Sequence, residues 1–168
     1  NGQLQVSAEG IAAFVQELAA KYDTAGTSRT FHTVSGRDVA LTGPYGWKID
    51  QAGEAAALSQ LIASTTESQI KEPLYSQSAV RRSGSDWGNT YVEIDLTGQH
   101  VYMIQEGAVV WDAPCVTGHV AKNYTTPEGI YSRTSKETDR ILRGAKQAGG
   151  CNAYESHGAH GMPFNGGF

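Results

Sequence analysis

Alternation of apolar and polar side chains is clearest in residues 91–129. The stretch YVEIDL from Tyr91 places Val92 and every second residue after it on one apolar face, and the intervening residues on a polar face. The pattern resumes at residues 101–105 and again at 108–117, after short interruptions that end in Gly. Because Gly supplies the positive φ of a tight hairpin, the pattern predicts an antiparallel meander of three strands.

The first third of the chain shows helical spacing at both ends. Ser7 is placed to cap a helix that runs to about Tyr22, and Asp50 to cap a second helix that ends near Ser64. The apolar faces expected for these helices are Ile11, Phe14, Val15 and Leu18, then Ala55, Leu58, Leu61 and Ile62. Short β-prone runs at residues 29–34 and 39–42 lie between the helices, so we expect a small α+β unit.

Residues 65–89 have little periodicity and contain Pro73 and Gly84, which indicates a domain boundary. We therefore predict two domains, residues 1–85 and 86–168, with a lead-in at residues 1–6 and an extended piece near 74–80. The second domain should be mainly β.

Beyond the meander, Pro127 and Gly129 indicate a turn. A strand is expected at residues 130–134. Its return strand is expected at 140–142, and a short helix over residues 135–143 is the alternative. The tail from Gly144 is rich in Gly and is interpreted as a loop.

The composition of the chain argues against some classes of function. The chain has 168 residues, 13 Lys and Arg against 17 Asp and Glu, and no basic run longer than Arg81-Arg82, so nucleic-acid binding is not expected. No apolar run is long enough to cross a membrane, and no signal peptide is present. Since the chain does not begin with Met, we expect it to be a piece of a longer protein.

Several residues have two open interpretations. Cys115 and Cys151 could pair or remain free thiols, and we favour free thiols. Cys151, His157 and His160 could form a nucleophile with a base or a metal site, but a loop without a fourth ligand favours incidental residues. Trp47 could stack on a sugar ring, as could Tyr45, although plugging a small core is the favoured role of Trp47.

An ordered set of motifs resembles the catalytic domain of bacterial L,D-transpeptidases. The set comprises YVEIDLTGQHVYMIQEGAVVWDAPCVTG, TPEGIY at Thr126, Leu142-Arg143-Gly144 and MPFNGGF at Met162. A weaker resemblance, carried by TVSG at Thr33, YGWKID at Tyr45 and the helix that follows, is to the peptidoglycan-binding domain that precedes this catalytic domain in Gram-positive members.

The resemblance implies acyl transfer without a metal or organic cofactor. In the family, a Cys thiolate attacks a peptidoglycan stem peptide, terminal D-Ala leaves, and an amine of a neighbouring stem accepts the acyl group. The catalytic Cys of the family lies after MPFNGG in a Ser-His-Gly-Cys motif, so we expect no catalytic residue in this chain and place the nucleophile after Phe168. Ser156-His157-Gly158-Ala159 is similar to that motif but lies upstream of Met162, and we interpret it as a coincidence.

The sequence supports one functional hypothesis and one alternative. The chain is expected to be a fragment of an exported, cell-wall L,D-transpeptidase, inactive alone and anchored to the membrane through a segment upstream. Substrate-binding residues are expected to be Met162, Pro163, Phe164, Asn165, Gly166 and Gly167. Carbapenem β-lactams would inhibit the full-length enzyme. The alternative is a non-catalytic peptidoglycan-binding module. The sheet of a truncated catalytic domain would keep open edges.

Overall fold

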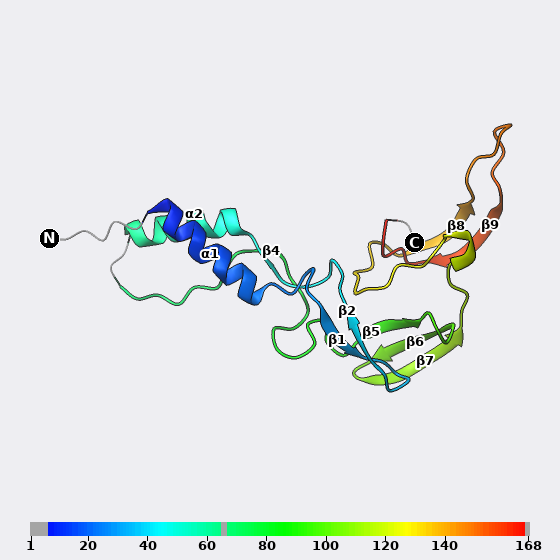
Figure 1. Ribbon diagram of the computed structural model, residues 1–168, viewed down its shortest axis with the longest axis horizontal. Helices are drawn as coiled ribbons and strands as arrows, with labels where there is room; N and C mark the ends of the chain where they lie inside the picture. Colours follow the sequence, from blue (N-terminus) through cyan, green and yellow to red (C-terminus); the bar gives the residue numbers. More distant parts are fainter. Residues whose placement is uncertain (1–6, 65–66, 167–168) are drawn as a thin grey trace. The chain divides into compact units, whose positions relative to one another are not determined.

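A computed structural model describes residues 7–64 and 67–166 (Figure 1). The chain forms two compact units, Asn1–Ile130 and Tyr131–Phe168. The predicted boundary between residues 85 and 86 falls inside the first unit, and the division into two domains at that point stays a prediction. The expected lead-in at residues 1–6 lies outside the described residues. Among the described residues, none of the helices has the length and apolar character needed to span a bilayer.

Both predicted helices are present. Helix α1 covers Ala8–Tyr22, and the Ser7 hydroxyl accepts the backbone N–H of Gly10 at 3.0 Å. Helix α2 covers Gln51–Ser64, and the Asp50 carboxylate accepts the N–H of Gly53 at 3.1 Å. The two polar residues thus satisfy N–H groups that the first helical turn leaves without a partner, which confirms the capping predictions.

The core of the first unit is small. It is built on a narrow stripe of α1, in which Ile11, Val15 and Ala19 follow at intervals of four residues and Val15 is completely buried. The remaining buried member of this core is Ile49, and Leu18, Ala55, Leu58 and Tyr75 pack around the core. Phe14 and Ile62 were expected on the apolar faces, but they are 54 % and 42 % exposed and do not belong to this core.

Four short strands accompany the helices. Strand β1 (Arg29–His32) pairs antiparallel with β2 (Asp38–Leu41), and β3 (Lys48–Ile49) pairs antiparallel with β4 (Tyr75–Gln77). The strands form two separate two-stranded ladders, not one sheet with the helices packed on it. The N-terminal part is therefore two helices with small ladders, which is a looser arrangement than the predicted α+β unit.

The predicted meander is confirmed. Strands β5 (Tyr91–Asp95), β6 (His100–Gln105) and β7 (Ala108–Pro114) form a three-stranded antiparallel sheet in chain order. Burial of its two faces does not follow their polarity. Glu93 on the polar face is buried, while Val92 on the apolar face is 52 % exposed. The polar face is the one that contacts the β1–β2 hairpin, as the bonds of Glu93 described below show.

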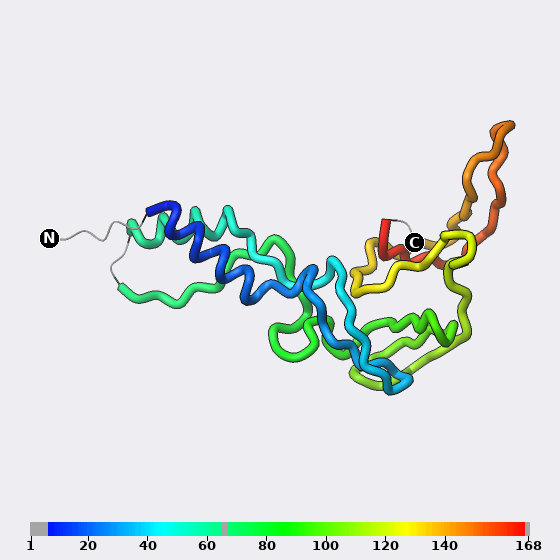
Figure 2. The backbone as a smooth tube through the Cα atoms, in the orientation of Figure 1, coloured from blue at the N-terminus to red at the C-terminus, as the bar shows by residue number. Residues whose placement is uncertain are grey.

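In the second unit, one strand was predicted in the wrong place and another was missed. Residues 130–134 form no strand, and the N–H of Thr134 bonds the Pro163 carbonyl at 2.8 Å instead of entering a ladder. Strand β8 (Glu137–Arg143) includes the predicted return strand, and it pairs with β9 (Glu155–Gly161), which was interpreted as loop. Figure 2 shows the chain doubling back between them. The sequence ESHGAHG lacks apolar alternation, so only the backbone pairing identifies β9.

Between β7 and residue 130 the chain is mostly irregular. A single 3₁₀ turn, η1, covers Val120–Lys122 within the polar loop that follows the meander. The turn predicted at residues 126–129 is reduced to a bend at Gly129. The next residue, Ile130, lies against the first part of the chain, where its N–H bonds the Thr42 carbonyl at 2.8 Å. Gly43 lies against this contact, since a Cβ there would come within 2.3 Å of the Ile130 carbonyl oxygen.

Candidate functional site

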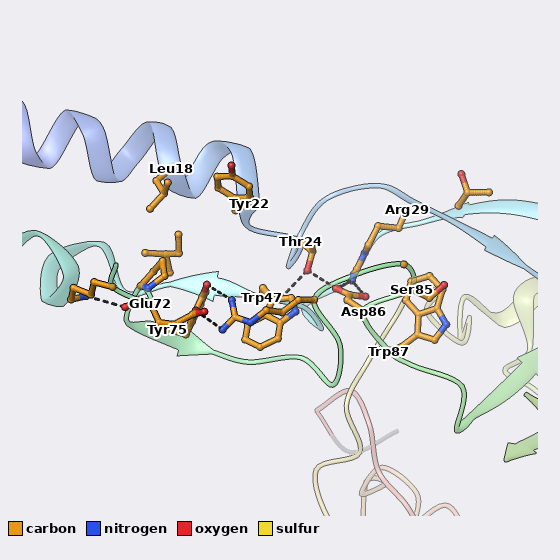
Figure 3. A pocket seen from close by; sticks show the side chains of 16 residues that line it. Leu18, Tyr22, Thr24, Arg29, Trp47, Glu72, Tyr75, Ser85, Asp86 and Trp87 are labelled. Atoms are coloured by element: carbon orange, nitrogen blue, oxygen red, sulfur yellow. Dashed lines mark hydrogen bonds and ion pairs between the residues drawn. The ribbon is translucent and has the colours of Figure 1, made fainter. Parts of the chain in front are cut away.

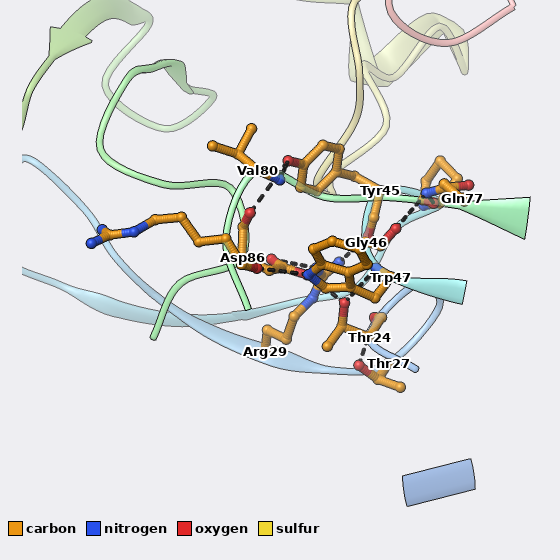
Figure 4. Close-up of polar contacts among 11 residues, drawn as sticks. Thr24, Thr27, Arg29, Tyr45, Gly46, Trp47, Gln77, Val80 and Asp86 are labelled. Carbon is orange, nitrogen blue, oxygen red and sulfur yellow. Dashed lines mark hydrogen bonds and ion pairs between the residues drawn. The ribbon is translucent and has the colours of Figure 1, made fainter. Parts of the chain in front are cut away.

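Asp86 is the centre of a buried polar cluster in the first unit (Figure 4). It is only 4 % exposed, and Nη1 of Arg29 donates to its two carboxylate oxygens at 2.8 and 2.6 Å. The Thr24 hydroxyl also donates to this carboxylate. Nη2 of Arg29 bonds the Tyr45 carbonyl at 2.7 Å. The cluster therefore joins residues 24–45 to the segment that leads into the meander.

A second connection links the turn after β1 to the meander. Both carboxylate oxygens of Glu93 accept the N–H of Val34, at 3.1 and 3.0 Å. Burial raises the pKa of Glu93, and the Val34 hydrogen bond opposes this shift. Nearby, Arg37 bonds Asp95 at 3.0 Å. Hydrogen bonds from the N–H groups of Gly98 and Thr97, and then Arg37, lower the pKa of Asp95.

Aromatic packing strengthens this contact between hairpin and meander. The ring of Phe31 in β1 lies 5.6 Å from the ring of Trp87 and 5.6 Å from that of Tyr91, the latter edge-to-face. Arg29 lies over Trp87 at 5.8 Å. Pairs of this geometry stabilise a fold beyond the area that they bury. The β1–β2 hairpin is thus held to the meander by both polar and aromatic contacts.

A cleft of about 710 Å³ opens next to the Asp86 cluster (Figure 3). On one side it is lined by Leu18 and Tyr22 of α1, and on the other by Trp47 and Tyr75 (Figure 3). The further lining residues are Thr24, Arg29, Thr30, Ile49, Lys71, Glu72, Pro73, Arg82, Gly84, Ser85, Asp86 and Trp87.

Trp47 and Tyr75 form an aromatic surface in this cleft, which we call the Trp47–Tyr75 platform. Their rings are 4.9 Å apart and inclined at 64°, and the Trp47 indole N–H donates to the Arg81 carbonyl at 2.6 Å. The Arg82 guanidinium lies 4.4 Å from the Trp47 ring and 4.8 Å from the Tyr75 ring. Trp47 is half-buried and packs on Tyr75, which borders the small core, so it does not fill the core itself.

Tyr45 has a structural role. Its hydroxyl accepts the N–H of Val80 at 3.1 Å and donates to the Asp86 carbonyl at 3.3 Å (Figure 4). Gln77 bonds the carbonyls of Pro44 and Gly46 at 2.8 and 2.9 Å. These bonds hold residues 44–46 against residues 77–86.

The segment predicted to bind substrate follows β9 in the second unit. The ring of Phe164 packs against the ring of Tyr131, with their centres 5.4 Å apart. The Pro163 carbonyl accepts hydrogen bonds from both the N–H and the hydroxyl of Thr134, each at 2.8 Å. Met162 is 56 % exposed, Asn165 is half-buried, and Gly166 adopts a positive φ of 61°. Gly167 lies outside the described residues. The segment is anchored at its centre, with Met162 accessible to solvent.

Neither cysteine is in a catalytic arrangement. Cys115 and Cys151 are both free thiols, and no hydrogen bond joins either thiol to a histidine within residues 7–64 and 67–166. Cys151 lies in the turn before β9, whereas His157 and His160 lie on that strand. No group of three metal-ligating side chains occurs in the described part of the chain.

The remaining histidines have ordinary surroundings. His32 pairs with Asp38 at 2.7 Å and His100 with Asp112 at 2.6 Å, both on the surface, and His157 lies 3.6 Å from Asp139. His119 precedes the turn η1 without a side-chain capping bond. None of these residues belongs to the cleft beside Asp86.

Sequence reasoning missed Asp86 and Glu93. Asp86 lies in the segment without periodicity, and Glu93 lies on the polar face of β5, where a solvated residue is the usual expectation. Buried acidic residues require partners, and the partners Arg29 and Val34 are distant in the sequence. No local signal marks either residue.

Comparison with known proteins relates this geometry to one family. Residues 89–164 match the sequence profile of the L,D-transpeptidase catalytic domain. A cysteine-to-serine mutant of the Enterococcus faecium L,D-transpeptidase is 26% identical, with a TM-score of 0.77, and the match covers 99% of this chain. The avibactam carbamoyl enzyme of Ldtfm is also 26% identical, with a TM-score of 0.76 and 98% coverage of this chain.

The chain spans 65% and 62% of the lengths of these two solved chains. No curated protein sequence matches it significantly. The small antiparallel sheets of the structure correspond to those of L,D-transpeptidase structures. The predicted resemblance to the L,D-transpeptidase catalytic domain is confirmed for residues 89–164, which contain YVEIDLTGQHV and the first three residues of MPFNGGF.

Proposed function

We propose that the chain is part of a cell-wall L,D-transpeptidase that cross-links peptidoglycan stem peptides. The observation that carries the proposal is the family match of residues 89–164 within a fold that agrees with L,D-transpeptidase structures over 99% of the chain. In this reaction a thiolate attacks the carbonyl before terminal D-Ala and forms a thioester. D-Ala leaves as an amine, and the amine of a neighbouring stem then displaces the thiol.

The residues of this chain contribute a scaffold and part of the substrate cleft. Phe164 is fixed on Tyr131, and the Pro163 carbonyl is fixed on Thr134, so the segment 162–167 has a defined backbone at its centre. Met162 offers an exposed apolar side chain, and Gly166 leaves room for a peptide backbone to approach. Bound substrate would lie along this segment.

We also propose that the nucleophile of the enzyme lies outside this chain, after the MPFNGG segment, as the family resemblance implies. Two observations agree with this proposal. About a third of each matched solved chain is not covered by this chain, and neither described thiol has a histidine partner. A thiol nucleophile is activated by an adjacent base that takes its proton, and neither cysteine has one among the described residues. The 168-residue chain alone is thus expected to be inactive.

Intact-mass spectrometry after incubation with a carbapenem tests this proposal. The avibactam carbamoyl adduct of a related structure supports β-lactam-type acylation in the family. We expect no adduct on the 168-residue chain and a single adduct, on a cysteine beyond Phe168, for a version extended in its natural sequence. An adduct on Cys151 of the shorter chain would contradict the assignment. A C151A variant is the matched control, because it removes that thiol alone.

We also propose that the protein faces the cell wall from outside the cell, and that its first part binds peptidoglycan. The alternative function is a non-catalytic peptidoglycan-binding module, which the unpaired thiols of this chain would also fit. An extended version that releases D-Ala from a tetrapeptide stem supports the enzyme. The binding role is tested by mixing residues 1–85, and separately the whole chain, with insoluble peptidoglycan and sedimenting the mixture. If neither protein co-sediments with the peptidoglycan, the binding role is refuted.

A further inference from the structure

The cleft beside the Asp86 cluster combines apolar faces with polar groups. The Trp47–Tyr75 platform forms one wall, and Leu18 and Tyr22 of α1 line the wall opposite (Figure 3). Aromatic and aliphatic side chains on opposite walls can contact both sides of a flat ligand that has C–H groups on its faces. All lining residues of the cleft belong to the first unit, whereas the MPFNGG segment belongs to the second, so the cleft is a separate candidate site.

The polar lining indicates the charge of the ligand. The cleft contains three cations, and each has a carboxylate partner: Arg29 with Asp86, Lys71 with Glu54, and Arg82 with Glu72. Because every one of these charges is compensated, a strongly charged ligand would meet no net attraction there. Donors and acceptors nevertheless line the same space, in Ser85, Glu72 and Lys71. A neutral ligand with many hydroxyl or amide groups fits this lining.

Saccharides have this combination of features. Their ring faces present C–H groups to aromatic rings, and their edges carry hydroxyls that need both donors and acceptors. A volume of about 710 Å³ is within the range of small-molecule sites and accommodates more than one sugar ring.

Arg82 covers the platform in the structure. Its guanidinium lies over Trp47 at 4.4 Å, and it donates to the Tyr75 hydroxyl at 2.6 Å and to Glu72 at 2.9 Å. The side chains of Arg82 and Glu72 are 53 % and 75 % exposed, so these contacts are partly solvated. Exposed cation–π contacts and surface ion pairs are weak, and Arg82 can therefore leave the ring at little cost.

We propose that this cleft is a saccharide-binding site in which Arg82 covers the Trp47–Tyr75 platform until a sugar ring replaces it. The inference deepens the proposed peptidoglycan-binding role, on which it rests for the natural ligand, a glycan chain of N-acetylated sugars. In this arrangement Trp47 supplies the stacking surface and Arg82 competes with the ligand. Removal of Arg82 should therefore strengthen binding, which is the opposite of what removal of an ordinary contact does.

The test uses chitotetraose, a tetramer of N-acetylglucosamine, titrated into the whole chain by calorimetry. We expect W47A to weaken binding roughly tenfold or more, and R82A to tighten it roughly threefold to tenfold. Matched controls are W111A and R133A, exposed residues outside the cleft, which should bind as the unaltered chain does. W47F keeps a smaller ring and separates loss of stacking from misfolding.

Binding that is absent in both the unaltered chain and R82A would overturn the proposal, as would weaker binding by R82A. Sedimentation with insoluble peptidoglycan separates this inference from the proposed function. If W47A co-sediments as well as the unaltered chain, the peptidoglycan-binding role stands and the cleft is not its site. If the unaltered chain fails to co-sediment while chitotetraose binds the cleft, the cleft stands and the proposed role falls.

Discussion

Replacing Asp86 with Ala should destabilise the first unit strongly. The substitution removes the carboxylate that accepts Arg29 at 2.8 and 2.6 Å and the Thr24 hydroxyl, at a position where the Arg29 and Asp86 side chains are only 13% and 5% exposed. The guanidinium would keep only the Tyr45 carbonyl, and its Nε already has no partner in the described residues. Loss of one partner of a buried pair costs about 3–5 kcal/mol, because the other charge stays buried.

We expect D86A to lower the free energy of unfolding by about 3 kcal/mol, since the Tyr45 carbonyl still accepts one hydrogen bond from Arg29. D86N keeps an acceptor without the charge and should lose about half as much. Arg29 and Asp86 form one interaction, so the double variant R29A/D86A should lose less than the sum of the single changes.

Urea unfolding followed by circular dichroism at 222 nm measures these losses, since helices α1 and α2 provide the signal. The matched control is D38A, which removes an Asp from the exposed pair with His32 and should cost less than 1 kcal/mol, as for surface pairs generally. If D86A unfolds at the same urea concentration as D38A, the Asp86 cluster does not hold the first part of the chain to the meander.

Three further predictions concern burial, backbone space and thiol chemistry. The raised pKa of Glu93 means that its protonated form favours folding, a contribution that is complete below the unfolded-state pKa and is lost as the pH rises through the folded-state pKa. The difference in unfolding free energy between E93Q and the unaltered chain should therefore grow in favour of E93Q from about pH 4 to about pH 7. In urea titrations, a difference that stays constant or falls over this range would contradict the burial argument. G43A should lose roughly 2 kcal/mol or more, because φ is +149° and a Cβ would lie 2.3 Å from the Ile130 carbonyl oxygen; G107A, at φ +83° in open space, isolates the backbone strain alone. Ellman's reagent should titrate two thiols per chain without a reductant, with the exposed Cys151 reacting before the half-buried Cys115, and a count of zero would indicate a disulfide.

Local patterns predicted the elements that depend on neighbouring residues. Ser7 and Asp50 cap helices because their oxygens reach N–H groups three residues ahead, and the meander from Tyr91 to Pro114 follows from alternation interrupted by short turns. Both features require only contacts close in sequence. The motifs that flank them were sufficient to indicate the family of residues 89–164.

Sequence patterns could not indicate how distant segments combine. The bonds Arg29–Asp86, Val34–Glu93 and Arg37–Asp95 join residues 57, 59 and 58 positions apart, and together they bury the polar face of β5. Alternation shows that a strand has two faces, but the face that is buried depends on which hairpin packs there. For the same reason Glu93 was expected in solvent and is buried.

The sequence by itself determined the two helices, the meander and the resemblance of residues 89–164 to the L,D-transpeptidase catalytic domain. The tertiary structure decided that ESHGAHG is a strand, that the rings of Trp47 and Tyr75 meet, and that Arg82 covers them. The physical reason is the range of the interactions. Helix caps and hairpin turns are satisfied within a few residues, whereas ladder pairing, buried ion pairs and clefts need partners that only the folded chain brings together.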